Sequence, residues 1–147
     1  MSDSTTYVWP ILAYRDARAA IAFLTAAFGF QEHAVYARDD DPSVIEHAEL
    51  GWPAGGGIML GTAGKDDSPF GRRHPGNDSV YVVCDDPDGL FAQATAAGAE
   101  VVRELRDEDY GSRGFTVRDL EGNLWSFGTY AGEQRAASEP AADARTP

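Results

Sequence analysis

The stretch VIEHAEL, residues 44–50, carries a histidine and a carboxylate two positions apart. Residues two apart in a β-strand lie on one face, so His47 and Glu49 are expected to point to the same side of a sheet. An imidazole beside a carboxylate can perform acid–base chemistry, hold a cationic ligand or contribute to a metal site. Without a third ligand the pair does not specify a metal, and on a solvated edge strand such residues are ordinary.

A second feature is the hydroxyl of Ser126, which interrupts an apolar run near the end of the chain. The segment FTVRDLEGNLWSFGTY, residues 115–130, has two alternating runs around the turn residues DLEGN, which predicts a β-hairpin. Asp119 and Gly122 are expected to serve the turn, with Gly122 supplying a positive φ. The side chain of Ser126 would then lie on the strand face opposite its two aromatic neighbours.

The length and composition are those of a single globular domain. The chain has 147 residues, of which 43% are hydrophobic and 11% aromatic, enough for a substantial core. Its net charge of −12 disfavours nucleic acid as a partner, because acidic proteins repel phosphate backbones. No stretch resembles a membrane span, and a single cysteine, Cys84, excludes an internal disulfide and a four-thiolate zinc site. We therefore expect a cytoplasmic protein with no membrane or nucleic-acid partner.

The order of the predicted elements repeats once along the chain. In each half, a strand is followed by a helix and then by three further strands. The helices are expected to begin at the N-caps Asp16 and Asp86 and to end at Gly29 and Gly98. Because these positions recur at nearly the same spacing, the pattern predicts two βαβββ modules of α+β type.

The predicted domain covers residues 1–130, with modules at 7–61 and 79–130 joined by a polar, turn-rich linker at 62–78. A module of this size buries little by itself, so the two must share a sheet or pair with another chain. Residues 131–147 have no periodicity and no aromatic residues, which predicts a disordered tail.

The repeated module order, the helix ending in FGF (residues 28–30) and the segment YGSRGFTVRDLEGNLWSFG (residues 110–128) together resemble the vicinal oxygen chelate superfamily. This superfamily includes glyoxalase I, extradiol dioxygenases and the bleomycin-resistance proteins, and the chain is most similar to its glyoxalase/bleomycin-resistance-like branch. The resemblance covers residues 7–130. It implies an α+β fold in which two βαβββ modules form a curved, mixed-sheet open barrel that is completed in a homodimer.

In the metal-dependent members, the resemblance implies one metal ligand on the first strand and one on the last strand of each module. The corresponding positions here are Trp9, Met59, Ser79 and Ser126. An indole offers no lone pair to a metal, and a thioether and two hydroxyls are poor ligands for hard ions. A shift of one residue would place Asp78 where Ser79 stands and would still supply only one good ligand. We therefore expect no metal site of the family type and no cofactor.

Strand alternation defines a candidate pocket. If the four positions above face a cavity, their strand neighbours are apolar and form a core beneath the helices. The other face then carries aromatic, hydroxyl and charged groups, as a small-molecule pocket requires. Alternatively, Trp9 and Met59 fill a collapsed cavity. The facing of His33 and Arg113 stays open. The residues expected to line the pocket are Trp9, His47, Glu49, Met59, Ser79, Tyr81, Thr116, Arg118 and Ser126.

These features favour a metal-free protein that binds and sequesters a small molecule, an antibiotic or metabolite of aromatic or cationic character. The alternative is an enzyme, a glyoxalase/dioxygenase-like lyase or isomerase with a non-standard metal or acid–base site around His47 and Glu49. A third possibility is a fold retained for association alone. A homodimer is expected because superfamily members pair their modules, and the linker at 62–78 is long enough for modules to be exchanged between chains.

Overall fold

Two modules of the same topology make up the described part of the chain. The computed structural model describes residues 5–133, so most of the expected disordered tail, 131–147, lies outside the described residues. The elements are β1 (Ile11–Tyr14), α1 (Ala17–Phe23), the π-helical segment η1 (Leu24–Phe28), β2 (Gln31–Arg38), β3 (Asp41–Gly51), β4 (Gly57–Thr62), β5 (Ser79–Val83), α2 (Pro87–Ala96), β6 (Glu100–Asp107), β7 (Arg113–Arg118) and β8 (Leu124–Gly128). The predicted α+β class with two βαβββ-like modules is confirmed.

Each module contributes one four-stranded mixed sheet. The strand order is β1-β4-β3-β2 in the first sheet and β5-β8-β7-β6 in the second. In both sheets the first strand of the module runs parallel to its last strand, and the remaining neighbours are antiparallel. The register places Ile11 beside Met59 and Tyr81 beside Ser126. Among the described residues the two sheets are separate, so a single chain does not close a barrel.

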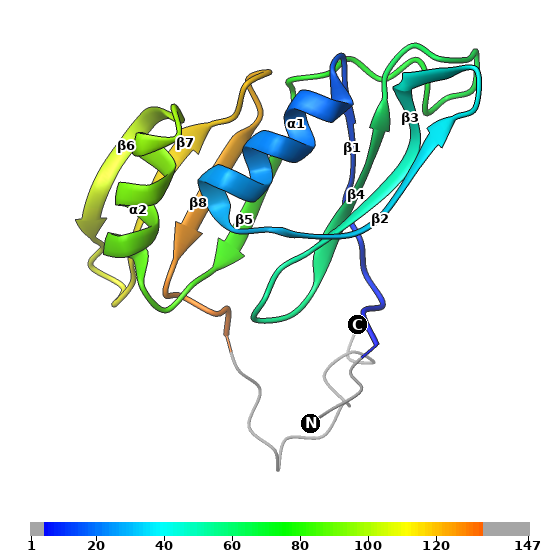
Figure 1. The fold of residues 1–147 in the computed structure, drawn as a ribbon. Helices are drawn as coiled ribbons and strands as arrows, with labels where there is room; N and C mark the ends of the chain where they lie inside the picture. Colours follow the sequence, from blue (N-terminus) through cyan, green and yellow to red (C-terminus); the bar gives the residue numbers. More distant parts are fainter. Residues whose placement is uncertain (1–4, 134–147) are drawn as a thin grey trace.

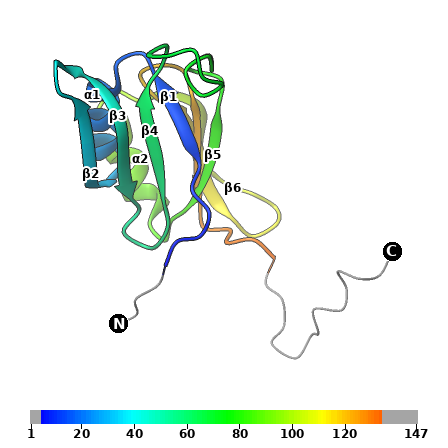
Figure 2. The same cartoon turned by 90° about the vertical axis from the view of Figure 1, so that its right-hand side faces the viewer.

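Both helices lie on the same side of the sheets. Figure 1 shows α1 and α2 in front of the strands, and in Figure 2 strands β4, β1 and β5 stand before the helices. The predicted caps are confirmed, because the carboxylate of Asp16 accepts a hydrogen bond from the backbone N–H of Ala19 and that of Asp86 from Gly89. The first helical segment ends at Gly29, whose φ is +90°. The opposite face of the sheets is left uncovered, and we call it the open face.

The core lies between the helices and the sheets and is continuous across the two modules. Phe28 of η1 contacts Trp125 and Phe127 of the second module, with ring centroids 5.3 and 4.7 Å apart. The apolar strand neighbours predicted to face the helices are buried or half-buried, except Val8, which is 82% exposed. The exception arises because β1 starts only at Ile11, so the residues before it lie outside the ladder.

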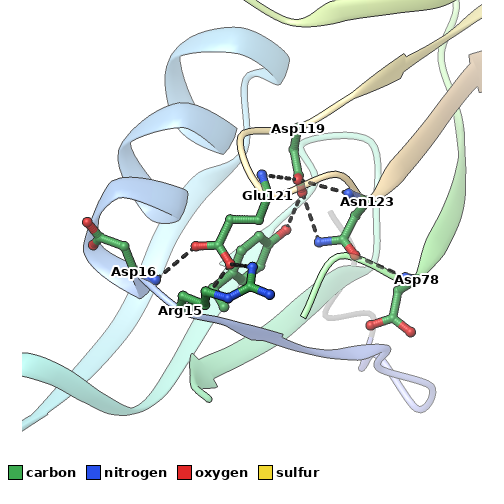
Figure 3. A network of polar contacts seen from close by, with 7 residues as sticks. Arg15, Asp16, Asp78, Asp119, Glu121 and Asn123 are labelled. Carbon is green, nitrogen blue, oxygen red and sulfur yellow. Dashed lines mark hydrogen bonds and ion pairs between the residues drawn. The ribbon is translucent and has the colours of Figure 1, made fainter. Parts of the chain in front are cut away.

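A buried carboxylate joins the modules at the turn between β7 and β8, and Figure 3 shows part of its network. Asp119 is 7% exposed. Its Oδ2 accepts hydrogen bonds from the Tyr14 hydroxyl at 2.6 Å, Trp125 Nε1 at 2.9 Å and Asn123 Nδ2 at 3.2 Å. Its Oδ1 accepts from the backbone N–H groups of Glu121 and Asn123. Burial raises the pKa of Tyr14, and the charge of Asp119 raises it further, so this phenol stays neutral.

The neighbouring Glu121 extends this connection. Its carboxylate accepts hydrogen bonds from the backbone N–H groups of Arg15 at 2.7 Å and Asp16 at 2.8 Å, at the junction of β1 and α1. Gly122 has a φ of +103°, as predicted for the turn. The turn therefore fixes the start of α1 in the first module relative to the hairpin of the second.

Candidate functional site

The open face of the second module contains a cavity that we call the tyrosine pocket. It has a volume of about 130 Å³, and its lining includes Tyr81, Arg103, Tyr110, Ser112, Thr116 and Ser126. Thr116 lies between Phe115 and Val117, which are buried under the helices, so alternation turns the threonine toward the open face. The same alternation turns Ser126 outward. Three predicted pocket residues, Tyr81, Thr116 and Ser126, are thus brought together.

Two glycines shape this pocket. Gly114 and Gly128 lie opposite each other on β7 and β8. A Cβ at Gly128 would stand 2.8 Å from the hydroxyl of Tyr81 and 3.2 Å from Ser112 Oγ, and one at Gly114 would collide with the backbone of β8. The absence of a side chain at Gly128 leaves room for the Tyr81 phenol, and its absence at Gly114 allows β7 and β8 to approach closely beneath the pocket.

The Tyr81 ring is held in this position by its own hydroxyl, which donates to the carbonyl oxygen of Tyr130 at 2.6 Å. Burial raises the pKa of the Tyr81 hydroxyl, so the phenol is neutral at physiological pH. Tyr81 as a residue is nevertheless 47% exposed, which leaves surface available for a ligand. Tyr110 and Tyr130 continue the aromatic wall, with their rings perpendicular at a centroid separation of 5.6 Å.

The hydroxyl of Ser126 has a partner. Its Oγ lies 2.8 Å from Thr116 Oγ1, across the two antiparallel strands, and either atom can be the donor. Two hydroxyls carry two hydrogens, and this contact uses one of them. The second hydrogen and the remaining lone pairs can therefore bond a polar atom in the tyrosine pocket.

The open face of the first module carries the predicted dyad of His47 and Glu49. His47 Nε2 lies 2.9 Å from Glu49 Oε2, and the ring of Tyr36 stacks on the imidazole at a centroid distance of 6.2 Å. The side chains of the pair are 41% and 33% exposed. His47 also lines a cavity of about 330 Å³ between this sheet and the linker, which contributes Lys65 and Phe70. The geometry permits acid–base chemistry, with the carboxylate orienting the imidazole.

An apolar groove of about 360 Å³ lies between the modules, where β5 faces the start of β4. Its lining includes Phe30, Trp52, Val80 and Tyr81. The indole N–H of Trp52 donates to the carbonyl oxygen of Val83 at 3.1 Å, so the turn before β4 is bonded to the edge of β5. Because Tyr81 lines both cavities, the groove and the tyrosine pocket meet at its ring.

The residues at the expected metal-ligand positions do not fit a metal ion. Trp9 uses its indole N–H to donate to the carbonyl of Thr6, at 3.2 Å. The residues paired with Met59 and Ser126 are Ile11 and Tyr81, which lie two positions after Trp9 and Ser79. If these two were the ligand positions on the first strands, they would also supply no imidazole or carboxylate. Across residues 5–133, no three His, Cys, Asp or Glu side chains are grouped so that they could hold a metal. The donor set therefore does not match the requirements of Zn²⁺, Ni²⁺ or Fe²⁺.

The remaining predicted residues are dispersed. The linings of the three cavities described above do not include Trp9, Glu49, Met59, Ser79 or Arg118. Arg118 pairs with Glu100 at 3.2 Å on the open face. Arg113, whose direction the sequence left open, points instead to Asp88 of α2, at 2.9 Å.

The remaining groups are the cysteine, two further histidines and three pocket-side residues that the sequence did not indicate. Cys84 is half-buried, and burial raises the pKa of its thiol, which makes the thiol a poorer nucleophile. His33 and His74 are exposed. Tyr110, Tyr130 and Arg103 were not anticipated. Tyr110 lies in the loop before β7 and Tyr130 in the segment after β8, where strand alternation does not predict the direction of a side chain.

Comparison with known proteins agrees with this topology. The family model described as "Glyoxalase/Bleomycin resistance protein/Dioxygenase superfamily" matches residues 6–127. TioX from Micromonospora sp. ML1 is 33% identical, with a TM-score of 0.69 over 83% of this chain and 98% of TioX. A glyoxalase/bleomycin resistance protein/dioxygenase family enzyme from Burkholderia phytofirmans PsJN shares the fold at 19% identity, with a TM-score of 0.64 over 84% of this chain and 98% of that one. No curated protein sequence matches the chain significantly.

None of the helices within residues 5–133 has the length and hydrophobicity that crossing a bilayer requires.

Proposed function

Because the chain belongs to the glyoxalase/bleomycin resistance protein/dioxygenase superfamily, we propose that it binds and sequesters a small organic molecule, an antibiotic or metabolite, without a metal ion. The observation that carries this proposal is the tyrosine pocket, whose walls are aromatic and whose polar groups are mainly hydroxyls. Such a composition is typical of ligand sites. Membership of the family does not by itself distinguish a binding protein from an enzyme, because one fold hosts many functions.

The pocket supports binding of an aromatic group. An engineered cavity of about 150 Å³ binds benzene, so a pocket of this size accommodates about one six-membered ring. Stacking on Tyr81 contributes about 0.5–1.5 kcal/mol beyond the buried area. A hydrogen bond from Thr116 or Ser126 contributes about 0.5–1.5 kcal/mol. Because Tyr81 is already fixed by its bond to Tyr130, little side-chain entropy is lost when the ligand binds.

We also propose that the protein works as a homodimer in the cytoplasm. Ile11, Tyr36 and Val83 leave apolar surface exposed on the open face, at 53%, 61% and 41%. A second copy that covers part of this face would enclose a ligand that the open sheets of one chain hold on one side only. Sedimentation equilibrium distinguishes a dimer from a monomer, and a monomer at micromolar concentration would contradict this part of the proposal.

The proposal is tested by ligand binding to chelator-dialysed protein. A compound library is screened by ligand-observed NMR, and each hit is titrated into the wild type and the Tyr81→Ala variant. We expect the loss of the ring to weaken binding by about tenfold, the equivalent of about 1.4 kcal/mol. Tyr7→Ala is the matched control, since Tyr7 is 88% exposed and outside the three cavities. Hits that bind Tyr81→Ala as well as the wild type would argue against the tyrosine pocket.

A second candidate function is metal-independent acid–base catalysis at His47. It is favoured by the 2.9 Å contact between His47 and Glu49 at the edge of the 330 Å³ cavity. A lyase or isomerase reaction needs a base that removes a proton from a bound substrate, and a neutral imidazole oriented by a carboxylate can do so. Hits from the screen are therefore followed over time by NMR. Conversion by the wild type that is lost in His47→Gln would move catalysis ahead of sequestration.

A further inference from the structure

We infer that the ligand of the tyrosine pocket carries an acidic group next to its aromatic ring, and that Arg103 binds this group. The inference rests on the proposed function and names the chemical class of the ligand. It replaces the cationic alternative in the ligand expected from the sequence, which was of aromatic or cationic character.

The first observation is the balance of charge in the ion pairs of the open face of the second module. Three guanidinium groups share two carboxylates there: Arg118 pairs with Glu100, whereas Arg103 and Arg106 both pair with Glu108. The chain as a whole carries −12. Within these ion pairs the guanidinium groups outnumber the carboxylates by one, so the pairs together carry a positive charge beside the pocket of an otherwise acidic protein.

The second observation is that the two arginines do not share Glu108 equally. Arg106 makes the short contact, with Nε 2.9 Å from Oε2 and Nη2 3.4 Å from Oε1. The Nη2 of Arg103 stays 3.4 Å from Oε2 and 3.5 Å from Oε1. A well-formed bond between a guanidinium and a carboxylate is about 2.7–2.9 Å long. The hydrogen-bonding capacity of Arg103 is thus largely unused, although its side chain is only 49% exposed.

The third observation is the position of Arg103. It is the strand partner of Thr116 and lines the tyrosine pocket, so its guanidinium lies on the same face as the pair of Thr116 and Ser126. A planar ring against Tyr81 would place a carboxylate or other acidic substituent between this guanidinium and the free hydroxyl hydrogen. Glu108 also lines the pocket, but its carboxylate is engaged by Arg106 at 2.9 Å. The groups left to bond a ligand are the guanidinium of Arg103 and a hydroxyl, and these are donors that suit an acceptor with negative charge.

The test uses three probes with the same ring and different charge: benzoate, benzamide and benzylamine. Each is titrated into chelator-dialysed protein by ligand-observed NMR at low ionic strength, where exposed charges are least screened. We expect benzoate to bind most tightly and benzylamine least. Arg103→Gln should weaken benzoate binding about two- to fivefold, as the loss of a half-exposed ion pair implies, and leave benzamide binding unchanged. Arg72→Gln removes the same charge from the exposed linker and should change nothing.

A variant that is expected to increase benzoate affinity controls for effects of misfolding. Glu108→Gln removes the carboxylate that competes for Arg103, so benzoate should bind more tightly than to the wild type, which no folding defect can produce. Benzylamine binding as tightly as benzoate, or benzoate affinity unaffected by Arg103→Gln, would overturn the inference. If benzamide binding still depended on Tyr81 in that case, the proposed function would stand. Absence of binding by all three probes would contradict both the inference and the assignment of the pocket.

Discussion

Replacing Asp119 by asparagine tests whether the buried carboxylate holds the two modules together. The substitution preserves the shape of the side chain and exchanges one acceptor oxygen for an NH₂ donor. In the wild type the carboxylate accepts five hydrogen bonds, three at Oδ2 and two at Oδ1. The amide of the Asp119→Asn variant would therefore turn a donor toward other donors in either of its orientations.

The magnitude follows from the number of donors that lose their acceptor. With the amide nitrogen at the Oδ1 position, it faces the backbone N–H groups of Glu121 and Asn123. In the other orientation it faces Trp125 Nε1 and Asn123 Nδ2, while the Tyr14 hydroxyl can rotate to accept. Each buried donor without a partner costs about 1–3 kcal/mol. Two of them predict a loss of about 2–6 kcal/mol, a large part of the usual stability of about 5–15 kcal/mol.

Urea unfolding followed by tryptophan fluorescence measures this loss, because Trp125 is fully buried within the network. Asp67→Asn is the matched control, since Asp67 lies exposed in the linker and the same exchange should change stability by less than about 0.5 kcal/mol. A loss below about 1 kcal/mol for Asp119→Asn would refute the view that this carboxylate joins the modules.

Three further predictions concern stability. Burial and the nearby carboxylate raise the pKa of Tyr14, so the folded state keeps a proton that the unfolded state loses. Stability is then full below about pH 10 and falls above it by up to about 1.4 kcal/mol per pH unit. Tyr14→Phe should flatten this slope in urea midpoints measured against pH, and an unchanged slope would contradict the assignment. Gly122→Ala forces a Cβ onto a backbone with φ of +103° and should cost about 1–2 kcal/mol, measured by the urea midpoint. Asp86→Ala removes the N-cap of α2 and should cost about 1 kcal/mol, whereas Asp86→Asn, which keeps a capping oxygen, should cost less in the same assay.

Local signals account for what the sequence predicted correctly. The caps at Asp16 and Asp86 depend on hydrogen bonds to N–H groups three residues away, so a short stretch of sequence is sufficient to identify them. Alternation likewise separated the buried Trp125 and Phe127 from Ser126, because β8 pairs regularly with its neighbours. The module repeat follows from these local patterns.

What the sequence did not indicate depends on contacts between distant residues and on irregular strands. Asp119 was assigned to its turn, but its bond to Tyr14 spans 105 positions, and no local pattern marks it. Arg103 and Arg106 are three apart, so alternation assigns them to opposite faces. The register of β6 shifts between them, and their partners Thr116 and Gly114 both face the tyrosine pocket. A bulge of this kind changes the side to which later residues point.

The tyrosine pocket is proposed to bind a small molecule without a metal ion. The most direct measurement is a ¹H–¹⁵N NMR titration of chelator-dialysed protein with the tightest hit of the library screen. We predict that the perturbed backbone signals cluster at Tyr81, Thr116 and Ser126, that α1 and α2 are unaffected, and that added Zn²⁺ changes neither the pattern nor the affinity. Perturbations centred on the helices, or binding that appears only after a divalent metal is added, would contradict the account.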